Sequence, residues 1–120
     1  TPAGIPYAFN SLHKAGTKLL MGSDAPVAPL DPWMAISAAV FGTESSDREP
    51  FQPEQCLDFE TALASSTAVG RVALRDADAA DLVLLDCDPS IIDSPEAMRA
   101  MPEHVLGTML AGRWTYQQAE

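Results

Sequence analysis

The sequence predicts an α/β fold with a small β element appended to it. A helical pattern at residues 6–15 leads into a short apolar run at 18–21, and a helix followed by a buried strand is typical of α/β units. A stronger strand pattern follows at 80–87, and two more strand patterns fill residues 105–116. These last three strands have no evident crossover helix between them, so we expect them to form a small β element beside the helical part.

Glycines delimit the first helix and the first strand. Phe9 and Leu12 lie at helical spacing, and Gly16 follows where a helix C-terminus prefers glycine. The apolar run 18–21 has a glycine on either side, the second being Gly22, which is the composition of a strand buried between layers of helix.

Prolines interrupt regular structure after this strand, and one of them then begins a helix. Asp31 stands at the N-cap position and Pro32 at the first position of a helix that we predict through Phe41. The inner face of this helix is expected to consist of Trp33, Ile36, Ala39 and Val40.

A polar, proline-bearing stretch at 42–55 is predicted to be a surface loop, and a second helix follows at 58–70 with Asp58 as its cap. Small side chains on one face of this helix would permit close packing. That face comprises Leu63, Ser66, Thr67 and Gly70.

The second half of the chain, from about residue 71, is richer in strands. The strand at 80–87 ends in the turn Asp86-Cys87-Asp88-Pro89, and a short helix is predicted at 95–100. Ala111-Gly112 separates strands at 105–110 and 113–116 as a two-residue hairpin turn.

Length and composition fit one modest globular domain. A chain of 120 residues can bury well over half of its unfolded surface, and 47% hydrophobic with 20% charged residues excludes a disordered protein. The formal net charge of −10 argues against nucleic acid or an anionic membrane as a partner. No segment has the roughly 20 apolar residues that span a bilayer.

Two further features concern cellular context. Cys56 and Cys87 are too far apart for a zinc knuckle or a redox pair, so we expect buried free thiols in a reducing cytoplasm. The sequence has no leader pattern at its start and does not begin with methionine, so we expect further residues upstream.

Asp24 is the main candidate for a functional residue. It is a lone acid three residues after the end of the apolar run, framed by Gly22, Ser23 and Pro26. A carboxylate at the end of a parallel strand stands where barrel and open-sheet enzymes place catalytic groups. The residues by themselves leave two interpretations open, a metal or proton site and a cap within the loop.

Other candidate groups have structural interpretations. His13 and His104 have no second histidine at ligand spacing and are expected to be ordinary residues. Asp86 and Asp88 flank Cys87, but the segment lacks the spaced acids and glycine of a calcium-binding loop, so a charged turn is expected.

Serine catalysis is not supported. Ser23 lacks the glycine that a hydrolase elbow requires two residues later, because position 25 is alanine. The hydroxyl residues Ser65, Ser66 and Thr67 are interpreted as small residues of a helix face.

Four segments together resemble a known family. They are AFNSLHKAGTKLLMGSDAPVAPLDPW, ETALASSTAVGR, ADLVLLDCDP and VLGTMLAGRWTY, and in order and spacing they cover residues 6 to about 116. The chain resembles the C-terminal portion of metal-dependent amidohydrolases, in particular amidohydrolase family 3.

The resemblance implies a fold and two segments. Residues 18–22 would be the eighth strand of a (β/α)8 TIM-like barrel, with the helices at 31–41 and 58–70 outside it. Residues 1–70 would belong to the barrel, and residues 71–120 would be return strands of a composite β-sandwich domain.

The resemblance also implies a function. Asp24 would be the acid that contacts the divalent metal, zinc foremost, and carries the proton to the leaving group during hydrolysis of non-peptide carbon–nitrogen bonds. The other metal ligands are not in this sequence, so the chain alone is expected to be inactive and to hold no metal, and its partner in the whole enzyme would be a small-molecule substrate. The alternative is a non-catalytic module that binds a partner or forms a homo-oligomer through unpaired strand edges. The charge of −10 also suggests a third interpretation, an acidic metal-storage or calcium-binding protein, but the acids are scattered along the sequence, which disfavours it.

Overall fold

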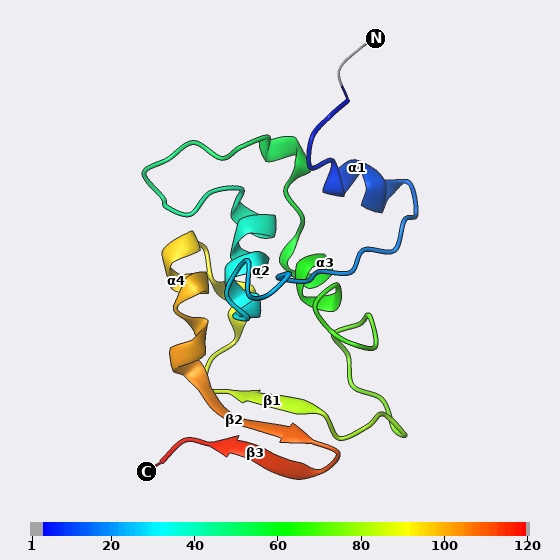
Figure 1. Ribbon diagram of the computed structural model, residues 1–120, viewed down its shortest axis with the longest axis vertical. Coiled ribbons are helices and arrows are strands. Elements are labelled where there is room, and N and C mark those ends of the chain that lie inside the picture. Colours follow the sequence, from blue (N-terminus) through cyan, green and yellow to red (C-terminus); the bar gives the residue numbers. More distant parts are fainter. Residues whose placement is uncertain (1–3, 120) are drawn as a thin grey trace.

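The helices lie on one side of a three-stranded sheet, with the sheet at one end of the molecule and α1 towards the other (Figure 1). This computed structural model describes residues 4–119; the outermost parts of the two predicted segments, residues 1–3 and 120, lie outside the described residues. The elements, in chain order, are α1 (Phe9–Lys14), α2 (Pro32–Phe41), a 3-10 turn (Pro53–Gln55), α3 (Phe59–Ala64), β1 (Leu82–Leu85), a 3-10 turn (Pro89–Ile91), α4 (Pro95–Arg99), a 3-10 turn (Met101–His104), β2 (Val105–Leu110) and β3 (Arg113–Gln117). None of the helices among these described residues is long and apolar enough to cross a membrane.

Helix α2 begins and ends as its sequence predicts. The Asp31 carboxylate accepts a hydrogen bond of 2.9 Å from the backbone N–H of Trp33, and Pro32 occupies the first turn. Gly42 ends the helix in a left-handed conformation with φ of 69°, and its N–H donates to the Ala38 carbonyl.

The core forms where α2 meets α3 and α4. Trp33, Ile36 and Ala39 on α2 are buried as predicted, while Val40 is only half-buried. Their buried partners are Leu57, Ala62, Met98 and Met101. The core therefore joins residues from both halves of the chain.

One polar residue in this core was not predicted to be buried. Ser37 on α2 is 1% exposed, and its hydroxyl donates a hydrogen bond of 3.2 Å to the carbonyl of Pro95 at the start of α4. This bond satisfies the buried hydroxyl and fixes α4 against α2.

The apolar run at 18–21 is not a strand, which corrects the sequence prediction. A strand requires a ladder of backbone hydrogen bonds with a neighbouring strand. Here Met21 N–H donates across to the Ser65 carbonyl at 2.9 Å, but no neighbouring strand of the described residues continues a ladder. Leu20 is accordingly 72% exposed instead of buried.

The helix predicted at 58–70 is also shorter than expected. Asp58 caps it, accepting from Thr61 N–H at 2.7 Å, but α3 ends at Ala64. The hydroxyls of Ser65 and Ser66 bond back to carbonyls of the preceding turn, which competes with further helix formation. Its buried residue is Ala62, not the predicted Leu63, Ser66, Thr67 and Gly70 face.

The segment 42–55 was predicted to be a surface loop, but it ends in a buried residue. Gln55 is 9% exposed, and its side chain both accepts from Ser11 N–H at 3.1 Å and donates to the Ser11 hydroxyl at 2.8 Å. These two bonds fasten α1 to the 3-10 turn Pro53–Gln55.

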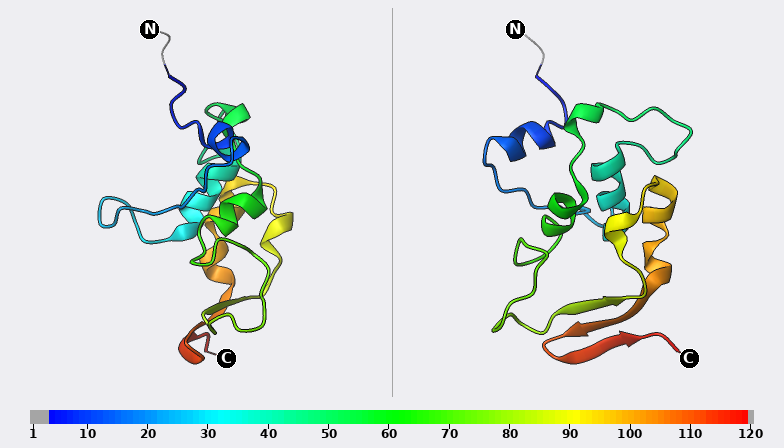
Figure 2. Two further views of the ribbon diagram at one scale, coloured as in Figure 1. Left: turned by 90° about the vertical axis from the view of Figure 1, so that its right-hand side faces the viewer. Right: turned by 180° about the vertical axis from the view of Figure 1, so that it is seen from behind.

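The predicted strands of the second half form one antiparallel sheet in the order β1-β2-β3. Leu110 pairs with Arg113 across the two-residue turn Ala111-Gly112, whose φ values of 51° and 79° are both positive, as a type I′ turn requires. β1 and β3 are the two edges of this sheet, and Figure 2 shows it from two further directions.

Replacement of Gly42 by alanine should lower the free energy of unfolding in two ways. An L-residue at this left-handed φ costs about 1–2 kcal/mol. The added Cβ would also lie 2.9 Å from Cys56 Sγ and 3.2 Å from the Phe51 carbonyl oxygen, and such overpacking typically costs about 1–3 kcal/mol more. Urea unfolding monitored by circular dichroism measures the sum.

Gly16→Ala is the matched control, because Gly16 has φ of 89° but a Cβ there meets no described atom within 4 Å. This variant should show only the conformational cost. Equal losses in the two variants would contradict the close packing at Gly42.

Candidate functional site

Asp24 lies at a turn in the exposed segment between residue 22 and α2. Its φ is 53°, a left-handed conformation that aspartate and asparagine tolerate better than most residues. The Asp24 carbonyl accepts from Val27 N–H at 2.9 Å, which closes the turn, and the side chain is exposed. The backbone thus presents the carboxylate outwards.

The residues around Asp24 are apolar but uncovered. Leu20, Val27 and Leu30 are 72%, 84% and 81% exposed. In the left view of Figure 2 this segment, drawn in light blue, projects away from the helices. Several large apolar side chains exposed in one segment suit a surface that another part of a protein covers.

A metal site needs at least three ligand atoms around one ion. Within residues 4–119 the group of acid, cysteine and histidine side chains that meets this requirement consists of Asp86, Cys87 and His104. Asp24 is not part of it. The described residues therefore do not fit a metal at Asp24 unless other ligands are added.

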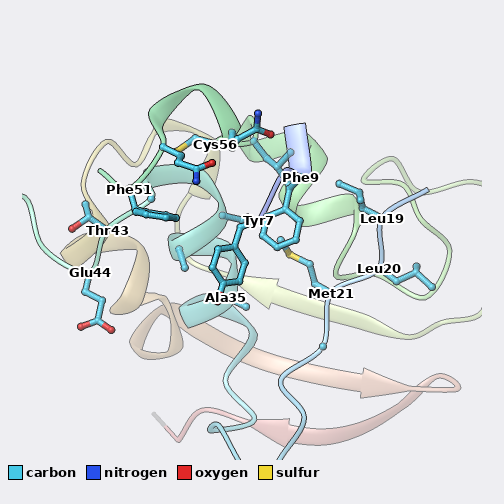
Figure 3. Close-up of a pocket in the computed structure, with 17 residues that line it drawn as sticks. Tyr7, Phe9, Leu19, Leu20, Met21, Ala35, Thr43, Glu44, Phe51 and Cys56 are labelled. Atoms are coloured by element: carbon cyan, nitrogen blue, oxygen red, sulfur yellow. The ribbon is translucent and has the colours of Figure 1, made fainter. Parts of the chain in front are cut away.

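A pocket of about 520 Å³ lies next to the base of the Asp24 segment and is mostly apolar (Figure 3). The rings of Tyr7 and Phe9 stand at its centre, and Phe51 approaches Tyr7 edge-on with ring centroids 6.2 Å apart. Other parts of its wall are residues 19–22, one side of α2, and residues 42–44, 51, 52 and 55–57. Such a concave apolar surface suits a small apolar ligand or apolar side chains of another polypeptide segment.

Cys56 lies on the wall of this pocket but is not an activated nucleophile. Burial, and to a lesser extent the charge of Glu54, raises the pKa of the Cys56 thiol above its usual value. The reactive form of cysteine is the thiolate, so this residue stays protonated at neutral pH.

A second cavity, of about 730 Å³, is more polar and includes His13, Lys18 and Arg71. Two acids, Asp58 and Glu60, also line it, and Asp58 is the cap of α3. Hydrogen bonds from the hydroxyl and the backbone N–H of Thr61 lower the pKa of Asp58, and the neighbouring His13 adds a smaller effect. His13 Nε2 lies 3.5 Å from the Thr61 hydroxyl. The Asp58 carboxylate therefore has a structural role, as the cap at the start of α3.

The structure brings His104 next to Asp86 and Cys87, which the sequence interpretation placed in a charged turn apart from it. Asp86, Cys87 and His104 each offer a ligand atom, and these atoms lie within 4.8 Å of one another. Asp88 is excluded, because its carboxylate caps the turn Pro89–Ile91 by accepting from Ser90 N–H at 2.9 Å. The signal for the group was the pairing of the strand at 80–87 with the strand at 105–110, which places their adjoining ends side by side.

The comparisons with known proteins identify one family. The sequence model of a family described as the amidohydrolase family matches residues 2–116, nearly the whole chain. No curated protein and no solved structure matches the chain significantly.

Proposed function

The chain belongs to the amidohydrolase family, and we propose that it is the C-terminal portion of a metal-dependent enzyme that hydrolyses carbon–nitrogen bonds other than peptide bonds. The observation that carries the proposal is the extent of the match, which includes the Asp24 segment, the helices and the three-stranded sheet. The substrate would be a small molecule bound mostly by segments outside these residues.

The proposed fold assigns each half a place in the larger enzyme. Residues 1–70 would contribute the last strand of a TIM-like barrel and its helices, and residues 71–120 would contribute strands of a composite β-sandwich. The exposed Leu20, Val27 and Leu30 support this assignment, because neighbouring barrel segments would cover them. Residues 18–22 would become a strand once another strand pairs with them.

Asp24 is proposed to carry a proton in the reaction. Its exposed carboxylate oxygen would accept the proton of the attacking water and return it to the leaving nitrogen, as a general base and then a general acid. In the whole enzyme a divalent metal, zinc foremost, would lower the pKa of that water to about 7 and Asp24 would be one of its contacts. The remaining ligands would come from other segments, so this chain alone is proposed to be inactive.

The proposed compartment is the cytoplasm. Cys56 and Cys87 are free thiols, and a reducing environment keeps thiols in that form. The net charge of −10 supports the proposal that neither nucleic acid nor an anionic membrane is a partner.

A second proposal is a non-catalytic module derived from the same fold, which would bind a partner or form a homo-oligomer. It is favoured by the two free edges of the sheet and by the exposed Trp114 and Tyr116 on β3, each 48% exposed.

Intact mass and hydrolysis assays on the protein purified from its native host separate these two proposals. The first expects a polypeptide several times larger than 12.8 kDa that hydrolyses compounds from a panel of N-acyl and cyclic amides. Activity should vanish after chelation and return with zinc, and the 120-residue chain expressed alone should be inactive. A native protein of 12.8 kDa without hydrolysis would support the module instead.

A further inference from the structure

Antiparallel pairing places residues 86 and 104 next to each other. Leu85 at the end of β1 pairs with Val105 at the start of β2. The residues just outside this pair, 86 and 104, therefore lie side by side. There, Asp86 N–H donates to the His104 carbonyl at 3.0 Å. The side chains also meet, with 2.7 Å between His104 Nδ1 and Asp86 Oδ1. The backbone thus holds an imidazole and a carboxylate side by side.

Cys87 adds a sulfur atom at the same point. It is half-buried, and its Sγ lies 3.8 Å from Met101 Sδ, at the edge of the apolar core. One ligand atom from each of Asp86, Cys87 and His104 lies within 4.8 Å of the others. The sulfur is therefore anchored by the core, while the other two ligands are anchored by the sheet.

We propose that Asp86, Cys87 and His104 bind a divalent transition metal of the zinc class. In a tetrahedral zinc site with the usual bond lengths, neighbouring ligand atoms are about 3.3–3.6 Å apart. The His104 Nδ1–Asp86 Oδ1 distance of 2.7 Å is shorter than this range and no pair in the group is farther apart than 4.8 Å, so shifts on the order of 1 Å would complete the geometry. Asp24 is not among these ligands, so the proposed ion is separate from the catalytic metal, and it departs from the expectation from the sequence that the chain alone holds no metal.

The donor set and the exposure define which ion fits. Thiolate and imidazole ligands select zinc and similar metals, whereas calcium and magnesium prefer oxygen alone. The side chains of His104 and Asp86 are 41% and 44% exposed, so an ion can enter and water can occupy its fourth position. Binding would break the Asp86–His104 hydrogen bond, form a sulfur–metal bond and release the Cys87 thiol proton to solvent.

Cobalt(II) titration of the metal-free 120-residue chain tests this site directly. We expect one ion per chain and a thiolate-to-cobalt charge-transfer absorption band, which zinc should abolish by displacement. Calorimetry in two buffers with different ionisation enthalpies should detect proton release on binding. Saturation without a charge-transfer band would overturn the proposal.

The chain offers matched controls, because it has one further cysteine and one further histidine. Cys87→Ser and His104→Gln should weaken cobalt binding by at least about a hundredfold. Cys56→Ser and His13→Gln should bind as the unaltered chain does. The same loss in either control variant would overturn the assignment of ligands.

A third ligand variant guards against loss of the fold. Asp86→Asn changes an exposed side chain of the same shape, and circular dichroism should show unchanged secondary structure. Its affinity for cobalt should fall at least about tenfold, because a neutral amide is a weaker ligand than a carboxylate. Unchanged affinity in this folded variant would contradict the three-residue site.

Discussion

Asp24→Asn should lower kcat of the amidohydrolase that carries this chain by about 10²–10⁴-fold, the usual contribution of a general acid–base group. The proposed role requires a carboxylate that gains and loses a proton, and an amide cannot do so. The fold should be unaffected, because the Asp24 side chain is exposed and asparagine tolerates its positive φ of 53°. Steady-state kinetics on the full-length enzyme, with metal analysis of both proteins, measure the effect.

The control for charge is Asp76→Asn, since Asp76 is also an exposed acid but lies outside the Asp24 segment. That variant should keep its kcat. If Asp24→Asn retained full activity, Asp24 would be only a residue of the turn that Val27 N–H closes. That result would remove Asp24 from the proposed mechanism while leaving the family unchanged.

Ile36→Ala should lower the free energy of unfolding by about 2–5 kcal/mol. Ile36 is 1% exposed on α2 and belongs to the same buried cluster as Ala62, Met98 and Met101. Truncation would leave a cavity where three helical segments meet, and the core has few other large residues to fill it. Because a domain typically has only about 5–15 kcal/mol of stability, this one side chain should decide whether the chain stays folded.

Ile91→Ala provides the matched control for this prediction. The substitution is identical, but Ile91 is 77% exposed, so its stability should change by no more than about 0.5 kcal/mol. Urea unfolding of the two variants against the unaltered chain measures the difference. Similar losses for Ile36 and Ile91 would mean that α2 is not the centre of the core.

Local signals predicted the elements whose ends depend on nearby residues. Asp31 and Pro32 begin α2, and Ala111-Gly112 makes the hairpin turn between β2 and β3. Each of these depends on backbone conformation or on a hydrogen bond within three residues, so the sequence contains all the information that they need.

Predictions that depended on distant partners were wrong or missing. The run 18–21 has strand composition, but no strand lies beside it among residues 4–119. The early end of α3 at Ala64 was missed for a local reason instead, because the hydroxyls of Ser65 and Ser66 bond to carbonyls four residues back. Gln55 is buried in a segment that was predicted to be a surface loop. Ser11 makes this possible by hydrogen bonding with its side-chain amide, and Ser11 lies 44 residues away in the sequence. Composition reports what a segment prefers, whereas partners decide what it forms.

The sequence by itself determined the family, the helix caps, the hairpin turn and the choice of Asp24 as the residue to test. Only the tertiary structure decided that Asp24 stands on an exposed turn, outside the ligand group found among residues 4–119, and that His104 lies beside Asp86 and Cys87. The physical reason is that caps and turns are local interactions. A ligand set or a strand ladder forms only when residues far apart in the chain are folded against one another.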